Sequence, residues 1–226
     1  MKNFEILKKL KSLGSEKVRE GMVRFGIRPK TEVYGVSMAQ LRSLAKKIEK
    51  DHALALRLWN SGVHEARILA SIVDEVEKVT ERQMDQWIKD LDSWDICDQI
   101  CMNLFWQTPF AHKKAIEWSK RKPEFEKRAG FALMAVLAWK DKSATHAKFK
   151  KFFPLIKKES IDERNFVKKA VNWALRQIGK RNKRLNVLAP KTAKEIQKID
   201  SKSAQWIASD AIRELQSAAI QKKLEK

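Results

Sequence analysis

An aromatic residue and an acid stand one helical turn apart in the segment Trp94-Asp-Ile-Cys-Asp98. Residues i and i+4 of a helix share one face, so this spacing places an indole ring beside a carboxylate. The rest of the chain is strongly basic, and a carboxylate normally weakens binding to an anionic polymer. An acid beside an aromatic ring in such a chain therefore indicates chemistry on a bound cation.

The composition limits the classes of partner. The chain has 226 residues, with 48 Lys and Arg against 28 Asp and Glu and a formal net charge of +20. This balance favours a polyanionic partner, most simply nucleic acid, over a membrane surface. A hydrophobic content of 43% allows a sizeable core and argues against a disordered chain.

Nothing in the sequence predicts a membrane anchor. The longest apolar stretch, residues 129–139, is shorter than the roughly 20 residues that cross a bilayer. The segment from Met1 to Phe4 leads into Lys-rich sequence without the apolar core of a signal peptide. We therefore expect a cytoplasmic protein with no membrane partner.

The two cysteines, Cys97 and Cys101, lie one helical turn apart beside Asp98. A zinc site would need two more ligands at a compatible spacing. The four histidines are scattered singly along the chain: His52, His64, His112 and His146. We therefore expect two buried thiols, and neither a bound metal ion nor a redox function.

Helices must position these side chains. The chain has only 7 Gly and 5 Pro, and alternating β patterns are nearly absent, which predicts an all-α fold. Apolar residues at helical spacing mark strong helices near residues 64–78, 94–107, 125–139, 165–180 and 204–217. Shorter, more polar helices are expected near residues 38–50, 80–92, 111–121, 144–157 and 190–199, with breaks at Asp92-Ser93, Lys122-Pro123 and Ala189-Pro190. The segment from Phe4 to Phe25 adds one or two helices, and a loop through Pro29 and Gly35 follows it.

Successive strong helices begin about 30 to 40 residues apart, the period at which helical-hairpin repeats stack. Several of them open with similar residues: Glu65-Ala-Arg67, Glu126-Lys-Arg128-Ala129 and Val167-Lys-Lys169-Ala170. Each hairpin in such an array buries its apolar face against its neighbours, and the stack curves around a concave surface. We therefore predict a superhelical solenoid of antiparallel hairpins, in one domain over residues 1–226, whose strong helices line a concave basic groove.

The helix near residues 165–180 carries two stripes. One is apolar, with Phe166, Ala170, Ala174 and Ile178, and the other is basic, with Lys169, Trp173, Arg176 and Lys180. Cations at this spacing can neutralise successive phosphates, and an indole offers a flat surface to a base or a deoxyribose. The run Lys180-Arg-Asn-Lys-Arg184, which includes Arg181, extends the charge into the next loop. The alternative is a tryptophan packed between repeats, with its cations forming a solvated face.

Other candidate residues have competing structural uses. Arg128, just before an apolar run, can bind a phosphate or make a structural ion pair with Glu124 or a neighbouring hairpin. A second aromatic and acid arrangement, Trp206, Asp210 and Arg213, is either a second nucleic-acid contact or a terminal cap. We expect the cap, in which Asp210 pairs with Arg213. The remaining tryptophans have the spacing of packing residues: Trp59, Trp87, Trp106, Trp118 and Trp139.

Three segments resemble the AlkD-like DNA alkylation repair family over most of the chain. They are Trp94-Asp-Ile-Cys-Asp98, Arg128-Ala129 and Phe166-Val-Lys-Lys-Ala-Val-Asn-Trp173-Ala-Leu-Arg176. The resemblance implies a HEAT-like solenoid that acts as a DNA glycosylase of base excision repair on N3- and N7-alkylated purines. It also implies a concave basic groove that grips duplex DNA. We expect a monomer that needs no cofactor and that associates with the nucleoid through DNA binding.

Position by position, the resemblance makes Asp98 the catalytic carboxylate and places Trp94 and Trp173 as aromatic walls beside the deoxyribose of the lesion. Arg128 resembles the phosphate-binding partner of that site, and Arg176 a backbone contact. The basic stripe adds Lys169, Lys180 and Arg181 as DNA contacts. The sequence departs from the family pattern at Ser93, Asn165, Asn172, Gln177 and Ile178, and Asn172 replaces a glycine that could lie close to the DNA backbone.

The sequence has no signature of a deep base-binding pocket, and the resemblance implies that an open groove holds the sugar and backbone of the lesion. We therefore expect selectivity to come from the charge of the lesion. Two other functions fit the same net charge. One is a non-catalytic helical-repeat module for nucleic acid, and the other is a scaffold for acidic proteins.

Overall fold

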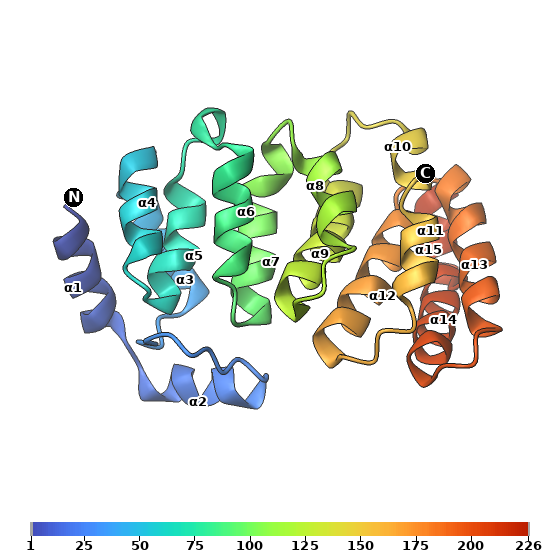
Figure 1. The fold of residues 1–226 in the computed structure, drawn as a ribbon, viewed down its shortest axis with the longest axis horizontal. Coiled ribbons are helices and arrows are strands. Elements are labelled where there is room, and N and C mark those ends of the chain that lie inside the picture. Colours follow the sequence, from blue (N-terminus) through green and yellow to red (C-terminus); the bar gives the residue numbers. More distant parts are fainter. Residues whose placement is uncertain (1, 226) are drawn as a thin grey trace. The chain divides into compact units, whose positions relative to one another are not determined.

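The structure, a computed structural model, describes residues 2–225. This part of the chain is helical throughout, with an isolated bridge between Glu32 and Val63 and no named strand. The helices form two compact units, unit 1 (Met1–Thr108) and unit 2 (Pro109–Lys226), drawn from blue to green and from green to red in Figure 1. Among the described residues, no helix is both long enough and apolar enough to cross a bilayer.

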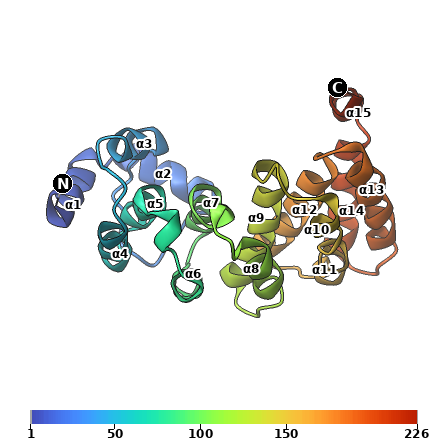
Figure 2. The ribbon, with the colours of Figure 1, turned by 90° about the horizontal axis from the view of Figure 1, so that it is seen from above.

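Unit 1 contains seven α-helices and two short 3-10 helices: α1 (Asn3–Leu13), α2 (Glu16–Arg24), α3 (Met38–Ala45), α4 (His52–Asn60), α5 (His64–Val73), η1 (Val76–Lys78), α6 (Glu81–Lys89), α7 (Trp94–Asn103) and η2 (Phe105–Gln107). Helix α5 lies between α4 on one side and α2 and α3 on the other (Figure 2). In the core, the Trp59 ring of α4 stacks on Trp87 of α6, with ring centroids 4.0 Å apart. Successive helix pairs are thereby joined through their apolar faces.

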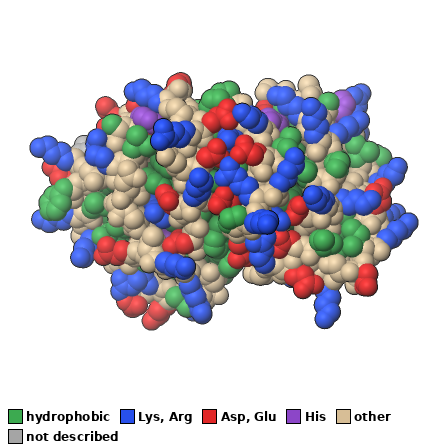
Figure 3. Space-filling view, viewed as in Figure 1, with side chains coloured by type: hydrophobic (Ala, Val, Ile, Leu, Met, Phe, Trp, Pro, Cys, Tyr) green, Lys and Arg blue, Asp and Glu red, His purple; other side chains and the backbone are tan. Residues whose placement is uncertain are grey.

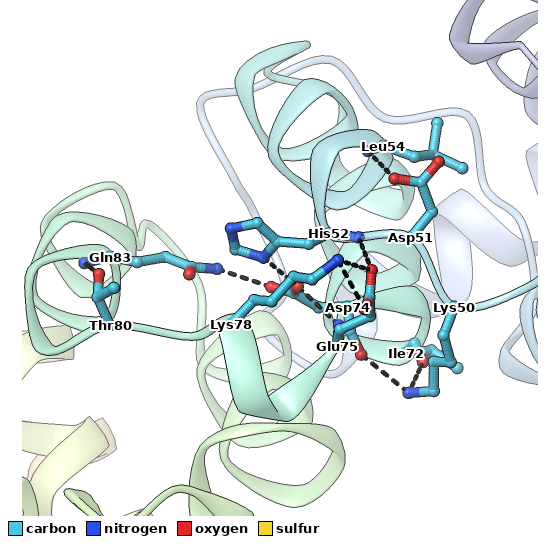
Figure 4. A network of polar contacts seen from close by, with 10 residues as sticks. All are labelled: Lys50, Asp51, His52, Leu54, Ile72, Asp74, Glu75, Lys78, Thr80 and Gln83. Carbon is cyan, nitrogen blue, oxygen red and sulfur yellow. Dashed lines mark hydrogen bonds and ion pairs between the residues drawn. The ribbon is translucent and has the colours of Figure 1, made fainter.

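A buried acid joins three helices of unit 1 (Figure 4). The Asp74 carboxylate, which follows α5, accepts hydrogen bonds from His52 Nδ1 of α4 and from Gln83 Nε2 of α6, both at 2.7 Å. Burial raises the pKa of Asp74 in spite of these hydrogen bonds. Lys50 Nζ donates to the backbone carbonyls of Ile72 and Asp74, which satisfies the end of α5.

Unit 2 contains eight helices: α8 (Ala111–Trp118), α9 (Glu124–Lys140), α10 (His146–Lys150), α11 (Phe153–Glu159), α12 (Asn165–Gly179), α13 (Lys183–Gln197), α14 (Lys202–Leu215) and α15 (Ala218–Glu225). Helix α9 is buried on all sides between residues 129 and 138 and packs along α12. Its Gly130 lets α8 approach closely, because a Cβ atom there would stand 2.3 Å from Ser119 N.

The all-α prediction is confirmed, and all five strong helices are present as α5, α7, α9, α12 and α14. Helices α4 and α15 were not expected, and the element near residues 144–157 is two helices, because Pro154 starts a new one. The predicted break at Ala189-Pro190 is wrong. Asn182 caps α13 eight residues earlier, and Pro190 lies inside the helix, in its buried face.

Several packing predictions can be compared with the burial of the side chains. Cys97 and Cys101 are buried, as expected, and so are three of the tryptophans assigned to packing: Trp59, Trp87 and Trp118. The prediction for Trp139 is wrong, because its side chain is 52% exposed and the Lys140 ammonium lies over the ring. Trp139 is the second-last residue of α9 and lies beyond the part of the helix that is buried in the core. The single domain stays a prediction.

Candidate functional site

The start of α7 is tied to the start of α5. Ser93 Oγ donates to Asp95 Oδ1 at 2.5 Å, and His64 Nε2 donates to Asp95 Oδ2 at 2.8 Å. Burial raises the pKa of Asp95, but the hydrogen bonds from His64 and Ser93 outweigh it and hold the pKa below its ordinary value. The ionised Asp95 therefore fixes the first turn of α7, the helix that carries Trp94 and Asp98.

Trp94 and Asp98 share the face of α7 that borders a cavity of unit 1. The Trp94 ring is half-buried, and its Nε1–H donates to the backbone carbonyl of Phe25 at 3.1 Å. Asp98 is 8% exposed. The aromatic and acid pair that the spacing predicted is therefore formed, with the carboxylate largely withdrawn from water.

The cavity has a volume of about 270 Å³ and lies entirely within unit 1. Helices α2, α5 and α7 form most of its wall, together with the segment that leads into α3. Its lining is mainly apolar, with Val18, Met22, Ile27, Val36, Met38, Ile68 and Met102 around the acids. The sequence did not reveal this cavity, because it arises where distant helices pack together rather than from a local pattern.

A buried glutamate holds one part of that wall. The Glu65 carboxylate of α5 accepts hydrogen bonds from the backbone N–H groups of Tyr34, Gly35 and Val36, at 3.1, 2.6 and 3.1 Å. Glu65 is 1% exposed, so these three donors have been removed from water and depend on it. The sequence marked Glu65 only as the start of a repeat, and its role depends on a loop about thirty residues away.

Unit 2 carries the other residues that the resemblance singled out. Arg128 lies in the first turns of α9 and is buried, and its Nη1 donates to the backbone carbonyl of Phe166 at 2.7 Å. This contact ties α9 to the start of α12, a structural use with the neighbouring hairpin. Trp173 of α12 is half-buried and Lys169 is exposed. The phosphate contact of Arg128 stays a prediction.

The basic stripe of α12 is partly neutralised within the protein. Arg176 Nη1 contacts Glu214 Oε2 at 2.5 Å, and Lys180 Nζ contacts Glu214 Oε1 at 2.6 Å. Burial raises the pKa of Glu214, but the two cations outweigh it and lower the pKa overall. Arg181 donates to the carbonyls of Ala138 and Ala144 at 3.0 and 2.8 Å. Within this stripe, Lys169 is therefore the most exposed cation.

The acidic partner helix α14 also contains the second aromatic and acid set. Asp210 pairs with Arg213, as predicted, and accepts a hydrogen bond from Asn172 Nδ2 at 2.7 Å. Asn172 is buried, so its side chain packs against α14. Trp206 is 42% exposed, and the Lys168 ammonium lies over its ring, 5.2 Å from the centroid.

The net charge is divided unequally between the units. Residues 1–108 contain 18 Lys and Arg against 16 Asp and Glu, a net charge of +2, whereas residues 109–226 contain 30 against 12, a net charge of +18. Figure 3 shows one face of the molecule, on which cations and acids are interspersed. The attraction to a polyanion therefore originates mainly in unit 2, while the Trp94 and Asp98 pair belongs to the nearly neutral unit 1.

The predicted site residues thus fall into two sets. Unit 1 brings together Trp94 and Asp98, with Asp95, His64 and Glu65 as supports that the sequence did not single out. Unit 2 holds Arg128 on α9 and the remaining candidates on α12 or just after it: Lys169, Trp173, Arg176, Lys180 and Arg181. The meeting of both sets in one groove stays a prediction.

Comparison with known proteins gives two matches. A family model described as DNA alkylation repair enzyme matches residues 6–215. The chain also superposes on a solved structure with a TM-score of 0.77 and 21% sequence identity, over 95% of each chain. That structure is described as a new family of proteins related to the HEAT-like repeat DNA glycosylases, with affinity for branched DNA structures. Its likeness confirms the HEAT-like helical repeat fold. No curated protein matches the chain.

Proposed function

Because this chain belongs to the family of DNA alkylation repair enzymes, we propose that it is a DNA glycosylase of base excision repair. Its substrate is duplex DNA that contains a purine alkylated at N3 or N7. Water adds to C1′ of the deoxyribose and gives up a proton to solvent, and the cationic purine leaves as a neutral base with the electron pair of the N-glycosidic bond. The products are a free alkylated purine and an abasic site.

The proposal depends on one observation: Trp94 and Asp98 lie together in the wall of one cavity. An alkylated purine is cationic and leaves readily, and positive charge passes to the deoxyribose as the bond breaks. A carboxylate about 4 Å from that charge attracts it by roughly 4 kcal/mol at an effective dielectric near 20. This is about three decades of rate. Cation–π contact with Trp94 adds about 0.5 to 2 kcal/mol.

Unit 2 supplies the remaining contacts in this proposal. Trp173 forms the second aromatic wall, and Arg128 binds a phosphate beside the lesion. The DNA backbone is bound by Lys169, Arg176, Lys180 and Arg181, and the net charge of +18 in residues 109–226 supports this assignment. For each phosphate that a cation neutralises, the plot of log affinity against log salt concentration becomes steeper by about 0.9.

The cavity restricts the form of the lesion. Its volume of about 270 Å³ is below the roughly 300 to 1,000 Å³ of pockets that enclose drug-sized ligands. We propose that the alkyl substituent enters the mainly apolar cavity while the deoxyribose stays in the groove, so that no deep base-flipping pocket is needed. Because recognition depends on charge, neutral lesions such as uracil are poor substrates.

The experiment is base release from methylated duplex DNA, with free purine and abasic sites measured for the wild type and for Asp98→Asn. We expect Asp98→Asn to bind the duplex but to release purine about a thousandfold more slowly, because it lacks the charge that stabilises the sugar cation. Glu49→Gln removes an equal charge at an exposed position of unit 1 and serves as the control. Equal rates for the wild type and Asp98→Asn would remove Asp98 from the mechanism.

A second candidate function is binding of branched DNA without catalysis. It is favoured by the solved structure of similar fold, whose description names affinity for branched DNA structures. A pure binder would release no purine, would prefer three-way or four-way junctions to plain duplex, and would gain affinity from Asp98→Asn because a negative charge leaves the groove. The same protein samples therefore separate the two functions.

A further inference from the structure

The turn after α2 displays an aromatic ring on an ordered backbone. Phe25 ends the helix, and its side chain is 76% exposed. Gly26 has a φ of 74°, its N–H donates to the carbonyl of Val23 at 3.0 Å, and Ile27 N–H donates to the carbonyl of Met22 at 2.9 Å. These two hydrogen bonds form a Schellman motif, which fixes the chain direction after a helix.

The same turn is attached to the candidate site. Trp94 Nε1 donates to the Phe25 carbonyl, and the residues that flank Phe25 in the motif, Met22 and Ile27, line the cavity together with Trp94 and Asp98. The backbone of Phe25 is thus held beside the cavity while its ring lies in solvent. The turn therefore presents an aromatic ring to solvent next to the candidate site.

The charges around Phe25 identify the partner. Residues 21–31 contain three cations and no acid, in a unit whose net charge is only +2. The acid that contacts this segment, Asp92, accepts the backbone N–H groups of Lys30 and Thr31. Arg24, Arg28 and Lys30 are all exposed. An exposed aromatic ring between cations matches a polymer that has phosphates outside and stacked rings inside, which is duplex nucleic acid.

We propose that Phe25 is a wedge that enters the base stack of duplex DNA beside the lesion, while Arg24 and Arg28 contact the flanking phosphates. Apolar side chains inserted between base pairs unstack the step and kink the duplex. Because the turn is bonded to Trp94, this local opening occurs next to the candidate site and exposes the deoxyribose of the lesion to Asp98. The inference rests on the DNA-binding part of the proposed function.

The test compares Phe25→Ala with Phe4→Ala, since Phe4 of α1 is 75% exposed and offers a matched loss of surface area. One substrate is a methylated duplex, and the other has an unpaired nucleotide beside the lesion, so that the step is already unstacked. Single-turnover purine release is measured on both. A 2-aminopurine next to the lesion reports unstacking by its fluorescence.

We expect Phe25→Ala to release purine at least about fivefold more slowly than the wild type from the plain duplex, the lower limit for loss of one aromatic that stacks on a base. Release from the bulged substrate should be restored, and Phe4→Ala should behave as the wild type on both. Equal rates for Phe25→Ala and the wild type on the plain duplex would overturn the proposal. An equal loss on both substrates would also overturn it, because a wedge is not needed where the stack is open.

The fluorescence readout separates this inference from the proposed function. If the wild type releases no purine but raises 2-aminopurine fluorescence in a way that depends on Phe25, the wedge stands and the glycosylase proposal fails. If release is normal and fluorescence does not depend on Phe25, the wedge fails alone. Binding of the wild type to anionic lipid vesicles that Phe25→Ala abolishes, without an effect on DNA, would assign the turn to a membrane and overturn the wedge.

Discussion

Replacing Glu65 by glutamine tests how firmly one buried carboxylate holds the cavity wall. The carboxylate accepts three backbone N–H groups, from Tyr34, Gly35 and Val36. A glutamine oxygen can keep the bonds to Gly35 and Val36, but its NH₂ group then faces the N–H of Tyr34. One buried donor is left without an acceptor, which costs about 1 to 3 kcal/mol, and the two remaining bonds lose their charge assistance.

The free energy of unfolding should therefore fall by about 3 kcal/mol in Glu65→Gln. With a urea dependence of about 2 kcal/mol per molar, the unfolding midpoint falls by about 1.5 M. Tryptophan fluorescence follows the transition, and hydrogen exchange at Gly35 and Val36 reports the loop directly. Glu32→Gln is the control, because Glu32 is exposed and its carboxylate accepts the Tyr34 hydroxyl, at 3.3 Å. Equal midpoints for Glu65→Gln and the wild type would refute the role of Glu65.

Two further predictions follow from ion pairs that involve Glu214 and Asp95. Glu214→Gln releases Lys180 and leaves Arg176 with its longer contact to Asp210, at 3.5 Å. Duplex affinity should therefore rise about threefold to tenfold at low salt, as measured by fluorescence anisotropy. An unchanged affinity would separate these cations from the DNA surface. Asp95 has a lowered pKa in the folded protein, so its contribution to stability is present above the unfolded value of about 3.9 and is lost as pH falls through the folded pKa. The stability difference between the wild type and Asp95→Asn should therefore be constant above about pH 5 and shrink on further acidification, and a difference that grows on acidification would contradict this assignment.

The sequence predicted the helices well because apolar periodicity is a local property. The stripe of α12 and the uninterrupted apolar run of α9 identify buried faces without knowledge of their neighbours. The prediction at Pro190 failed because a proline inside a helix removes one backbone hydrogen bond and usually ends the helix, whereas α13 continues through Pro190 while packed on α14. Helix α4 was missed because its nine residues lie in a short segment just before a stronger pattern.

The site was predictable only in part. The i, i+4 spacing of Trp94 and Asp98 follows from their shared helix, and the structure places both beside one cavity. The supports of that cavity depend on contacts between distant segments, such as Asp95 with His64, which no local pattern encodes. The same applies to Glu214, whose position on α14 converts Arg176 and Lys180 from a solvated stripe into ion pairs.

The burial of the two thiols on α7 has a chemical consequence. Cys97 and Cys101 are 0% exposed, one turn apart on the helix of Asp98. Thiolates are the most nucleophilic groups in a protein, and the electrophiles that modify purines attack them as well, whereas thiols buried in apolar surroundings are inert. If the protein acts on alkylated purines, as proposed above, it works where those reagents are present. Its two thiols are shielded from these reagents, so the protein should remain unmodified at its cysteines when the DNA around it is alkylated.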